Sequence, residues 1–278
     1  MFVGIDFAPL PNRALNTAAA DAMELLGFND FEYVVVGNRE VPYLNDLDIA
    51  IGRNQLASHL KLARGGCFWT ALDAYLESRN IGEYVIRDKF RQFHFATPFF
   101  RMHASPAFVK TDVFIGEIGW MKALTSGAPK ESRYKAIYRN LLLMSVFLEL
   151  KWPAENGVGN EYFRYALNFR DGLRRRRFRQ VHPSRQDGIP KRVTIHEEFI
   201  TSDPNDIPRI LFDGKSEWTD IDSFEKLYLL LGGDSFRYSS FLPAICQNFL
   251  MSLHKGKMRL PEKDIEWLSS GGQRSGYA

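Results

Sequence analysis

The sequence is poor in cysteine and has no long uninterrupted run of apolar residues. Only two of its 278 residues are cysteines, Cys67 and Cys246, and neither belongs to a CxxC pair, which excludes a disulfide framework and cysteine zinc sites. The first residues lack a basic segment followed by an apolar one, and the longest apolar stretch, 141–150, is interrupted by Ser145 and Glu149. We therefore expect a soluble cytoplasmic protein that is neither exported nor held in a membrane.

The sequence also lacks internal repeats and histidines at metal-ligand spacing. His94 and His103 are therefore expected to be structural or surface residues. The composition is that of a globular protein, with 45% hydrophobic and 14% aromatic residues. This supplies a core for one large domain or two modest ones.

The order of predicted elements divides the chain near residue 126. In the first half, helices are expected at 14–26 and 54–64, and strands at 33–36, 47–51, 83–87, 91–96 and 107–115. In the second half, helices are expected at 132–151, 160–178, 223–231 and 238–254. The sequence therefore predicts a mixed α/β domain over residues 1–126, followed by a mostly helical domain over residues 127–278.

Two aspartates begin the second predicted strand. Asp46 and Asp48 point to the same face, because alternate residues of a strand do so. Two adjacent carboxylates repel each other unless a cation lies between them. Mg²⁺ binds one or two carboxylates together with phosphates and water. The pair is therefore a candidate site for a metal-bound nucleoside triphosphate.

The same DxD spacing recurs at Asp220 and Asp222, but there it precedes Ser223 at an expected helix start. Capping explains this second pair without any chemistry. The first pair differs in its context, which is an aliphatic strand, a glycine turn at Gly37, a loop and a second aliphatic strand.

This arrangement resembles the DNA polymerase beta-like nucleotidyltransferase superfamily. Members of that family have an aliphatic strand that ends in Gly-Ser or Gly-Gly, a DxD on the next strand and a third acid on a later strand. The resemblance covers roughly residues 14–145 and implies a mixed-sheet nucleotidyltransferase catalytic domain. The residues that match the turn, the DxD and the third acid are Gly37, Asn38, Asp46, Asp48 and Asp112.

Asp112 lies in an alternating apolar stretch, where an aspartate on a buried strand needs a partner. A metal ion would be such a partner. The alternatives are a side chain that faces solvent or an ion pair with Arg101 or Lys110. Glu117 is a weaker candidate for the third acid, because Gly116 is expected to end the strand.

The resemblance further implies a two-metal mechanism with Mg²⁺ or Mn²⁺ and an NTP as substrate. One ion lowers the pKa of the acceptor hydroxyl, and the other binds the triphosphate. By this resemblance Asp46 and Asp48 bind both ions, Asp112 binds the ion at the acceptor, and Gly37 and Asn38 lie near the nucleotide's phosphates.

Lys135 and Arg139 are candidates for contacts to the β- and γ-phosphates. They lie four residues apart on a predicted helix and therefore share a face. The alternative is a solvated surface pair. The opposite face of this helix is expected to carry an apolar row of Ile137, Leu141, Met144 and Leu148.

Positive charge is concentrated in one part of the chain. Residues 164–192 contain ten Lys or Arg and two acids, a local balance of +8, so that an overall charge of +3 leaves −5 for the rest. This asymmetry indicates a polyanionic partner. The candidate surface for an RNA acceptor is the run of Arg174, Arg175, Arg176 and Arg177.

Taken with the resemblance, the sequence predicts a metal-dependent enzyme that moves a nucleoside monophosphate from an NTP to an acceptor hydroxyl, with RNA as the favoured acceptor. One alternative is transfer to a protein or small molecule, as in AMP-transferring and toxin-type relatives. Another is a non-catalytic nucleic-acid-binding or virion protein that keeps the fold. The layout also loosely resembles nucleotidyltransferases carried by tailed bacteriophages.

Overall fold

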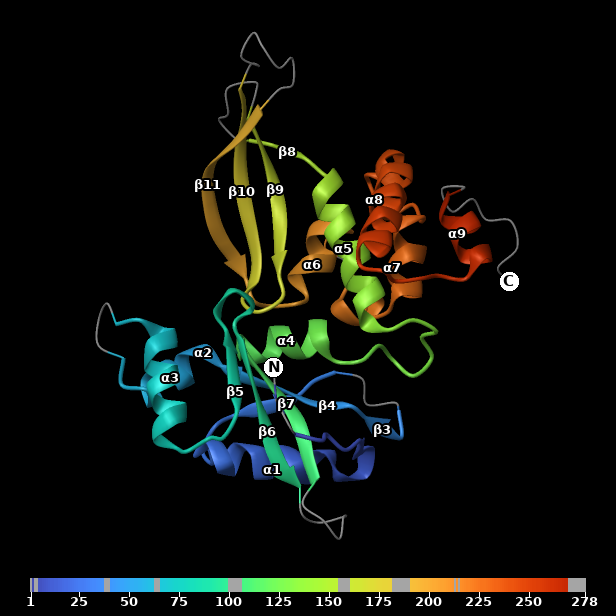
Figure 1. The fold of residues 1–278 in the computed structure, drawn as a ribbon. Helices are drawn as coiled ribbons and strands as arrows, with labels where there is room; N and C mark the ends of the chain where they lie inside the picture. Colours follow the sequence, from blue (N-terminus) through green and yellow to red (C-terminus); the bar gives the residue numbers. More distant parts are fainter. Residues whose placement is uncertain are drawn as a thin grey trace. The chain divides into compact units, whose positions relative to one another are not determined.

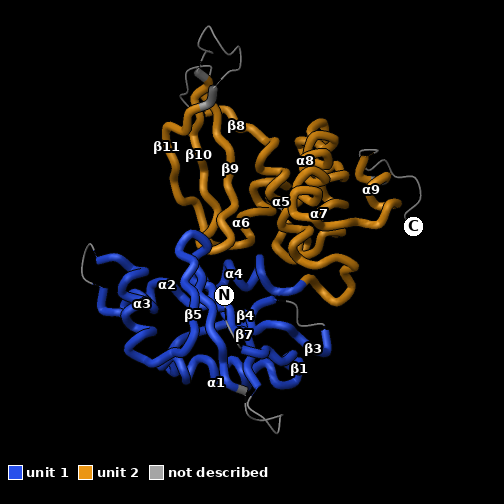
Figure 2. The backbone as a smooth tube through the Cα atoms, in the orientation of Figure 1, with its two compact units in different colours: residues 1–127 blue, residues 128–278 orange. Residues whose placement is uncertain are grey.

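The chain consists of two compact units, residues 1–127 and residues 128–278 (Figure 2). The computed structural model describes residues 2, 5–37, 41–62, 66–99, 107–154, 161–181, 191–212, 214 and 216–269. Among the helices of these residues, none is both long and apolar enough to cross a bilayer.

The first unit is a mixed α/β domain (Figure 1). Its elements in chain order are β1 (Leu10–Pro11), η1 (Asn12–Ala14), α1 (Leu15–Leu26), β2 (Tyr33–Val35), β3 (Tyr43–Leu44), β4 (Asp46–Gly52), α2 (Arg53–His59), α3 (Phe68–Ser78), β5 (Tyr84–Arg87), η2 (Asp88–Phe90), β6 (Gln92–Phe99), β7 (Ala107–Gly116) and α4 (Ile118–Thr125). Five strands form a sheet in the order β2-β4-β7-β6-β5. The β4–β7 pair is parallel and the other neighbours are antiparallel, so the sheet is mixed.

Alternate residues of β4 belong to two different layers. Ile49 is fully buried in the large core cluster that contains the apolar face of α1. Ala50 points the other way and packs with Met121 of α4. Because alternate strand residues share a face, Asp46 and Asp48 lie on the same side of the sheet as Ala50. The acidic pair therefore lies on the α4 side of the sheet.

The elements predicted for this unit are largely confirmed. Gly27, with a left-handed φ of 71°, ends α1 where a terminating glycine is expected. The predicted strands correspond to β2, β4, β5, β6 and β7. Helix α2 ends at His59 and is shorter than predicted, and α3 is an addition to the predicted elements.

The second unit combines helices with a four-stranded antiparallel sheet in the order β11-β10-β9-β8. Helix α5 packs against α7, α8 and strand β9. The elements of this unit are α5 (Ala136–Glu149), β8 (Trp152–Pro153), β9 (Glu161–Asn168), β10 (Gly172–Val181), β11 (Lys191–Thr201), α6 (Asp206–Leu211), η3 (Trp218–Asp220), α7 (Phe224–Leu231), η4 (Ser239–Phe241), α8 (Leu242–Lys255) and α9 (Glu262–Ser269).

The helix predicted over 160–178 is wrong, because residues 161–168 and 172–181 form the hairpin of β9 and β10. The Asn168 side chain accepts hydrogen bonds from the backbone N–H groups of Arg170 and Asp171, at 2.9 and 3.3 Å. Such a turn, followed by Gly172 at a φ of 141°, reverses the chain where a helix would have to continue. The arginine-rich run is therefore part of a sheet.

Helix α5 packs with the face opposite to the one predicted. Arg139 is only 1% exposed, whereas Ile137, Met144 and Leu148 are 42–45% exposed. The helix is apolar around most of its circumference, so periodicity alone does not determine which row is buried. The apolar residues that are buried are Ala136, Leu142, Leu143, Val146 and Phe147.

Candidate active site

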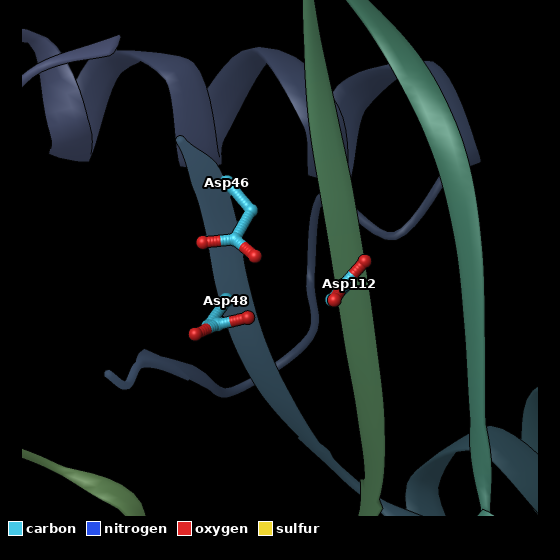
Figure 3. A group of neighbouring side chains, drawn as sticks. All are labelled: Asp46, Asp48 and Asp112. Atoms are coloured by element: carbon cyan, nitrogen blue, oxygen red, sulfur yellow. The ribbon is translucent and has the colours of Figure 1, made fainter. Parts of the chain in front are cut away.

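The first unit brings the three predicted acidic residues together (Figure 3). Asp48 and Asp112 are direct partners in the parallel β4–β7 register, and Asp46 is the partner of Lys110. Each of the three aspartates offers a carboxylate oxygen within 4.8 Å of the others. Such a group of oxygen ligands could bind a divalent metal ion.

Two further side chains contact the carboxylate of Asp112. His94 lies opposite Asp112 in the antiparallel β6–β7 register, and its Nδ1 is 2.5 Å from Oδ1 of Asp112. Lys110 Nζ donates to Oδ2 of Asp112 at 2.8 Å and lies 3.8 Å from Oδ2 of Asp46. The ion pair with Lys110, expected as an alternative to a metal, is therefore present beside the acidic cluster. The other alternative partner, Arg101, lies outside the described residues.

These contacts determine the ionisation of Asp112. Burial of the side chain raises its pKa, but the hydrogen bonds from His94 and Lys110, together with their charge, outweigh burial and hold the pKa below its usual value. Asp112 is therefore a carboxylate at neutral pH, as a metal ligand must be.

His94, expected from the sequence to be a structural or surface residue, contacts the acidic cluster through Asp112. It is 5% exposed, and Gln92 Nε2 lies 3.1 Å from its Nε2. The chain of contacts from Gln92 through His94 to Asp112 fixes the orientation of a carboxylate that belongs to the acidic cluster. No sequence spacing indicates this contact, since it depends on the register of β6 against β7.

We expect His94→Leu to lower the free energy of unfolding by about 1.5–3 kcal/mol, because a hydrogen bond to a buried charged group is lost. Urea denaturation measures this change. A matched control on the same strand is Thr97→Val, which removes the neutral bond between Thr97 and Thr111 and should cost about 0.5–1.5 kcal/mol. A smaller loss for His94→Leu than for Thr97→Val would contradict the role given to His94.

Gly37 lies against the acidic cluster. Its φ is +87°, and a Cβ at this position would be 2.7 Å from Oδ2 of Asp48. The backbone is held on both sides, since Gly37 N–H donates to Thr125 at 2.9 Å and its carbonyl accepts from Gly127 at 2.8 Å. Only glycine fits here without displacing the carboxylate. Its predicted neighbour in the turn, Asn38, lies outside the described residues.

The two basic candidates for phosphate binding have different environments. Lys135 is exposed at the N-terminal end of α5, and its role stays a prediction. The guanidinium of Arg139 is buried within the second unit, where it donates to the Asp222 carbonyl at 2.7 Å and lies over the Trp218 ring. Burial lowers the pKa of Arg139 to about 10. These contacts explain Arg139 as a structural residue and contradict its assignment to phosphate.

Glu117, the weaker candidate for the third acid, lies at the far end of the strand pair. It follows Gly116, whose register partner is Gly52, four residues beyond the pair of Asp48 and Asp112, which is roughly 13 Å along a strand. There it lines a cavity of about 340 Å³. Glu117 is therefore not a third ligand of the cluster on β4 and β7.

The second DxD pair has the structural role expected for it. The Asp220 side chain accepts from the backbone N–H of Glu217 at 2.8 Å, and Ser223 caps α7 by accepting from the N–H of Lys226. Asp222 contributes an ion pair with Lys226 at 2.9 Å. Caps and a helix ion pair therefore explain the pair without a metal.

The four arginines predicted to bind RNA are distributed over both faces of β10. Their guanidinium groups contact glutamates of the neighbouring strands: Glu197 contacts Arg174 and Arg176, Glu198 contacts Arg175, and Glu161 contacts Arg177. Two of these glutamates follow residue 192, and one precedes residue 164. The local excess of +8 is therefore smaller in space than it is in the sequence.

No protein-family model matches this chain. No curated protein sequence matches it either. Among solved structures it is similar to a ternary P/T complex of Leishmania infantum polymerase beta, at 14% sequence identity and a TM-score of 0.37, with 73% of each chain covered. It is also similar to a ternary gap complex of the same polymerase, at 13% identity and a TM-score of 0.33, over 58% of this chain. The match covers about half of that second polymerase chain, 52%.

Proposed function

We propose that this chain is a metal-dependent nucleotidyltransferase that moves a nucleoside monophosphate from an NTP to a hydroxyl of an RNA acceptor. The observation that carries the proposal is the cluster of Asp46, Asp48 and Asp112 on two adjacent parallel strands, with carboxylate oxygens within 4.8 Å of one another. Lys110 contacts two of these carboxylates, Asp46 and Asp112, and a divalent cation would offset the remaining repulsion among the three.

The formal charge of the cluster suits a divalent cation. Three carboxylates and the ammonium of Lys110 have a formal balance of −2. Carboxylate oxygens are the ligands that Mg²⁺ and Mn²⁺ prefer, and Mg²⁺ commonly completes its shell with substrate phosphates and water. The donor set therefore fits a metal-bound triphosphate.

When bound, two such ions would supply charge neutralisation at the triphosphate and a lowered pKa of the acceptor hydroxyl. In the proposed arrangement Asp46 and Asp48 would hold both ions, and Asp112 would hold the ion beside the acceptor. His94 and Lys110 fix the direction of the Asp112 carboxylate. Gly37 leaves room for the carboxylate of Asp48.

The acceptor is assigned to RNA because of the arginines on β10. The side chain of Arg176 is 45% exposed and that of Arg174 is 32% exposed, and Glu197 contacts both. Arginine binds phosphate through a planar fork of donors and keeps its charge at every physiological pH. A polyanionic acceptor therefore fits this strand better than a neutral one does.

Transfer of label tests the proposal. We expect the purified chain to move label from one of the four NTPs into total RNA when Mg²⁺ or Mn²⁺ is present, and EDTA to abolish the transfer because the metal ions are removed. Label found in protein or in a small molecule would replace RNA as the acceptor. Absence of label in RNA, protein and small-molecule fractions alike would contradict the proposed activity and favour a non-catalytic protein with this fold.

A further inference from the structure

The sheet of β9, β10 and β11 has two faces with different partners. Tyr165 lies on one face, where its ring is 6.0 Å from Phe147 of α5 and 4.8 Å from Trp152. We call this the α5 face. Arg175 and Arg177 lie on it too, because their register partners on β9 are Tyr165 and Phe163.

We call the opposite side of the sheet the open face. It carries the residues of β10 that alternate with Arg175 and Arg177, together with their register partners on β9 and β11. One of these partners, Phe199 of β11, is 53% exposed. The side chains of the open face include Tyr162, Arg164, Arg174, Arg176, Phe178 and Glu197.

On the α5 face the arginines are engaged with the protein itself. Arg175 donates to Glu198 at 2.6 Å and lies 4.5 Å from the centroid of the Phe163 ring. Arg177 and Arg179 both contact Glu161, whose side chain is buried. These ion pairs lower the pKa of Glu161, so they act on a carboxylate that stays ionised. The arginines of the α5 face are therefore engaged in ion pairs within the protein.

On the open face Arg174 and Arg176 share one carboxylate, and Arg174 also lies 3.5 Å from Oδ2 of Asp171. Glu197 accepts from Arg174 at 3.0 Å through Oε1 and from Arg176 at 2.6 Å through Oε2. Arg164 is the direct register partner of Arg176, and like charges directly opposite each other on a sheet are destabilising. An anion bound between these arginines would offset that repulsion.

Aromatic rings accompany the charges of the open face. Tyr162 and Phe178 are register partners whose rings stack with centroids 5.5 Å apart. Lys151 and Arg164 lie over the Tyr162 ring, 5.3 and 5.6 Å from its centroid. Arginines that bind phosphates, beside aromatic rings on which bases stack, are the elements of single-strand recognition on a sheet.

We propose that the open face of β9–β11 is a binding surface for single-stranded RNA, with Arg164, Arg174 and Arg176 on the phosphates and Tyr162 and Phe178 against the bases. The proposal rests on the proposed function only in naming this RNA the acceptor. Arg174 and Arg176 are roughly 6.6 Å apart along the strand, about twice the rise per nucleotide of a stacked strand. A strand of RNA can therefore place a phosphate at each.

The experiment measures binding without NTP or divalent metal, so it does not depend on catalysis. Fluorescence anisotropy of a labelled single-stranded RNA is followed at rising KCl concentrations. We expect Arg174→Gln/Arg176→Gln to weaken binding about tenfold or more at low salt, and to reduce the log–log salt slope by about 1.4, since each single-strand phosphate contact contributes about 0.7.

The matched control is Arg175→Gln/Arg179→Gln, which removes the same charge from the other face of the same strand. Glu161 keeps Arg177 as a partner in this variant, and thermal melts establish that both variants are folded. The control should change affinity less than twofold. Equal losses in both variants, or wild-type affinity in the open-face variant, would overturn the proposal. So would equally tight wild-type binding to a duplex of the same sequence.

Discussion

Asp48→Asn is expected to abolish nucleotide transfer and, in the same protein, the binding of Mg-NTP. Asp48 is the register partner of Asp112, and its carboxylate lies within 4.8 Å of those of Asp46 and Asp112. Asparagine keeps the shape of the side chain and removes its charge. We expect a loss of roughly 10³-fold or more in kcat/KM, since charge stabilisation at the reacting phosphate is lost.

Asp112→Asn should reduce nucleotide transfer without reducing the binding of Mg-NTP. In the proposed site this residue serves the acceptor hydroxyl, and Asp46 and Asp48 still hold the nucleotide's metal. The loss should therefore appear in kcat while the affinity for Mg-NTP is kept. A transfer assay is paired with calorimetry of nucleotide binding.

Asp222→Asn is the matched control, since it makes the same substitution in the second DxD. It weakens the ion pair with Lys226 and removes the carboxylate charge near the buried guanidinium of Arg139, so thermal melts establish that the variant is folded at the assay temperature. Transfer by this variant should equal that of the wild type. If Asp48→Asn also transfers normally, the nucleotidyltransferase proposal is wrong. If only Asp112→Asn transfers normally, the third ligand is a different residue.

Gly37→Ala is expected to reduce transfer by about 100-fold although no charged group is changed. Alanine would place a methyl group 2.7 Å from Oδ2 of Asp48. The backbone hydrogen bonds of Gly37 to Thr125 and Gly127 hold the turn in place, so the carboxylate must move instead. A displacement of about 1 Å in a reacting site costs on the order of 10²-fold in rate. Initial rates at saturating NTP and metal measure the effect.

The strain of a left-handed alanine has to be separated from the displacement of Asp48. Gly214 supplies that control, because its φ is +76° and a Cβ there meets nothing within 4 Å. Gly214→Ala should share the backbone cost of about 1–2 kcal/mol and keep normal transfer. An equal loss of transfer in both variants would show that strain alone, and not the position of Asp48, reduces activity.

The sequence predicts the parts of this molecule that depend on local order. The strand that carries Asp46 and Asp48 is recognisable from its alternation, and the end of α1 from Gly27, because each depends on neighbouring residues. The resemblance to a known family then selects Asp112, and the structure brings it to the other two acids. Whether these residues catalyse transfer stays a prediction that the substitutions above test.

The parts that could not be predicted depend on partners distant in the sequence. His94 meets Asp112 through the β6–β7 register, which no spacing within one segment reveals. The arginine run lies in a strand, where its guanidinium groups contact glutamates before residue 164 and after residue 192. Arg139 is buried because α5 offers two apolar rows and the packing of α7, α8 and β9 selects one of them.

The parallel pairing of β4 with β7 has a consequence for the order of folding. A parallel pair needs a crossover, and here the crossover contains α2, α3, β5 and β6. The chain entropy lost in closing that long loop is repaid only when the central strands have joined. Nascent or partly unfolded chains therefore do not hold the three carboxylates together. A divalent ion that binds the assembled carboxylates will favour the native state over the unfolded states.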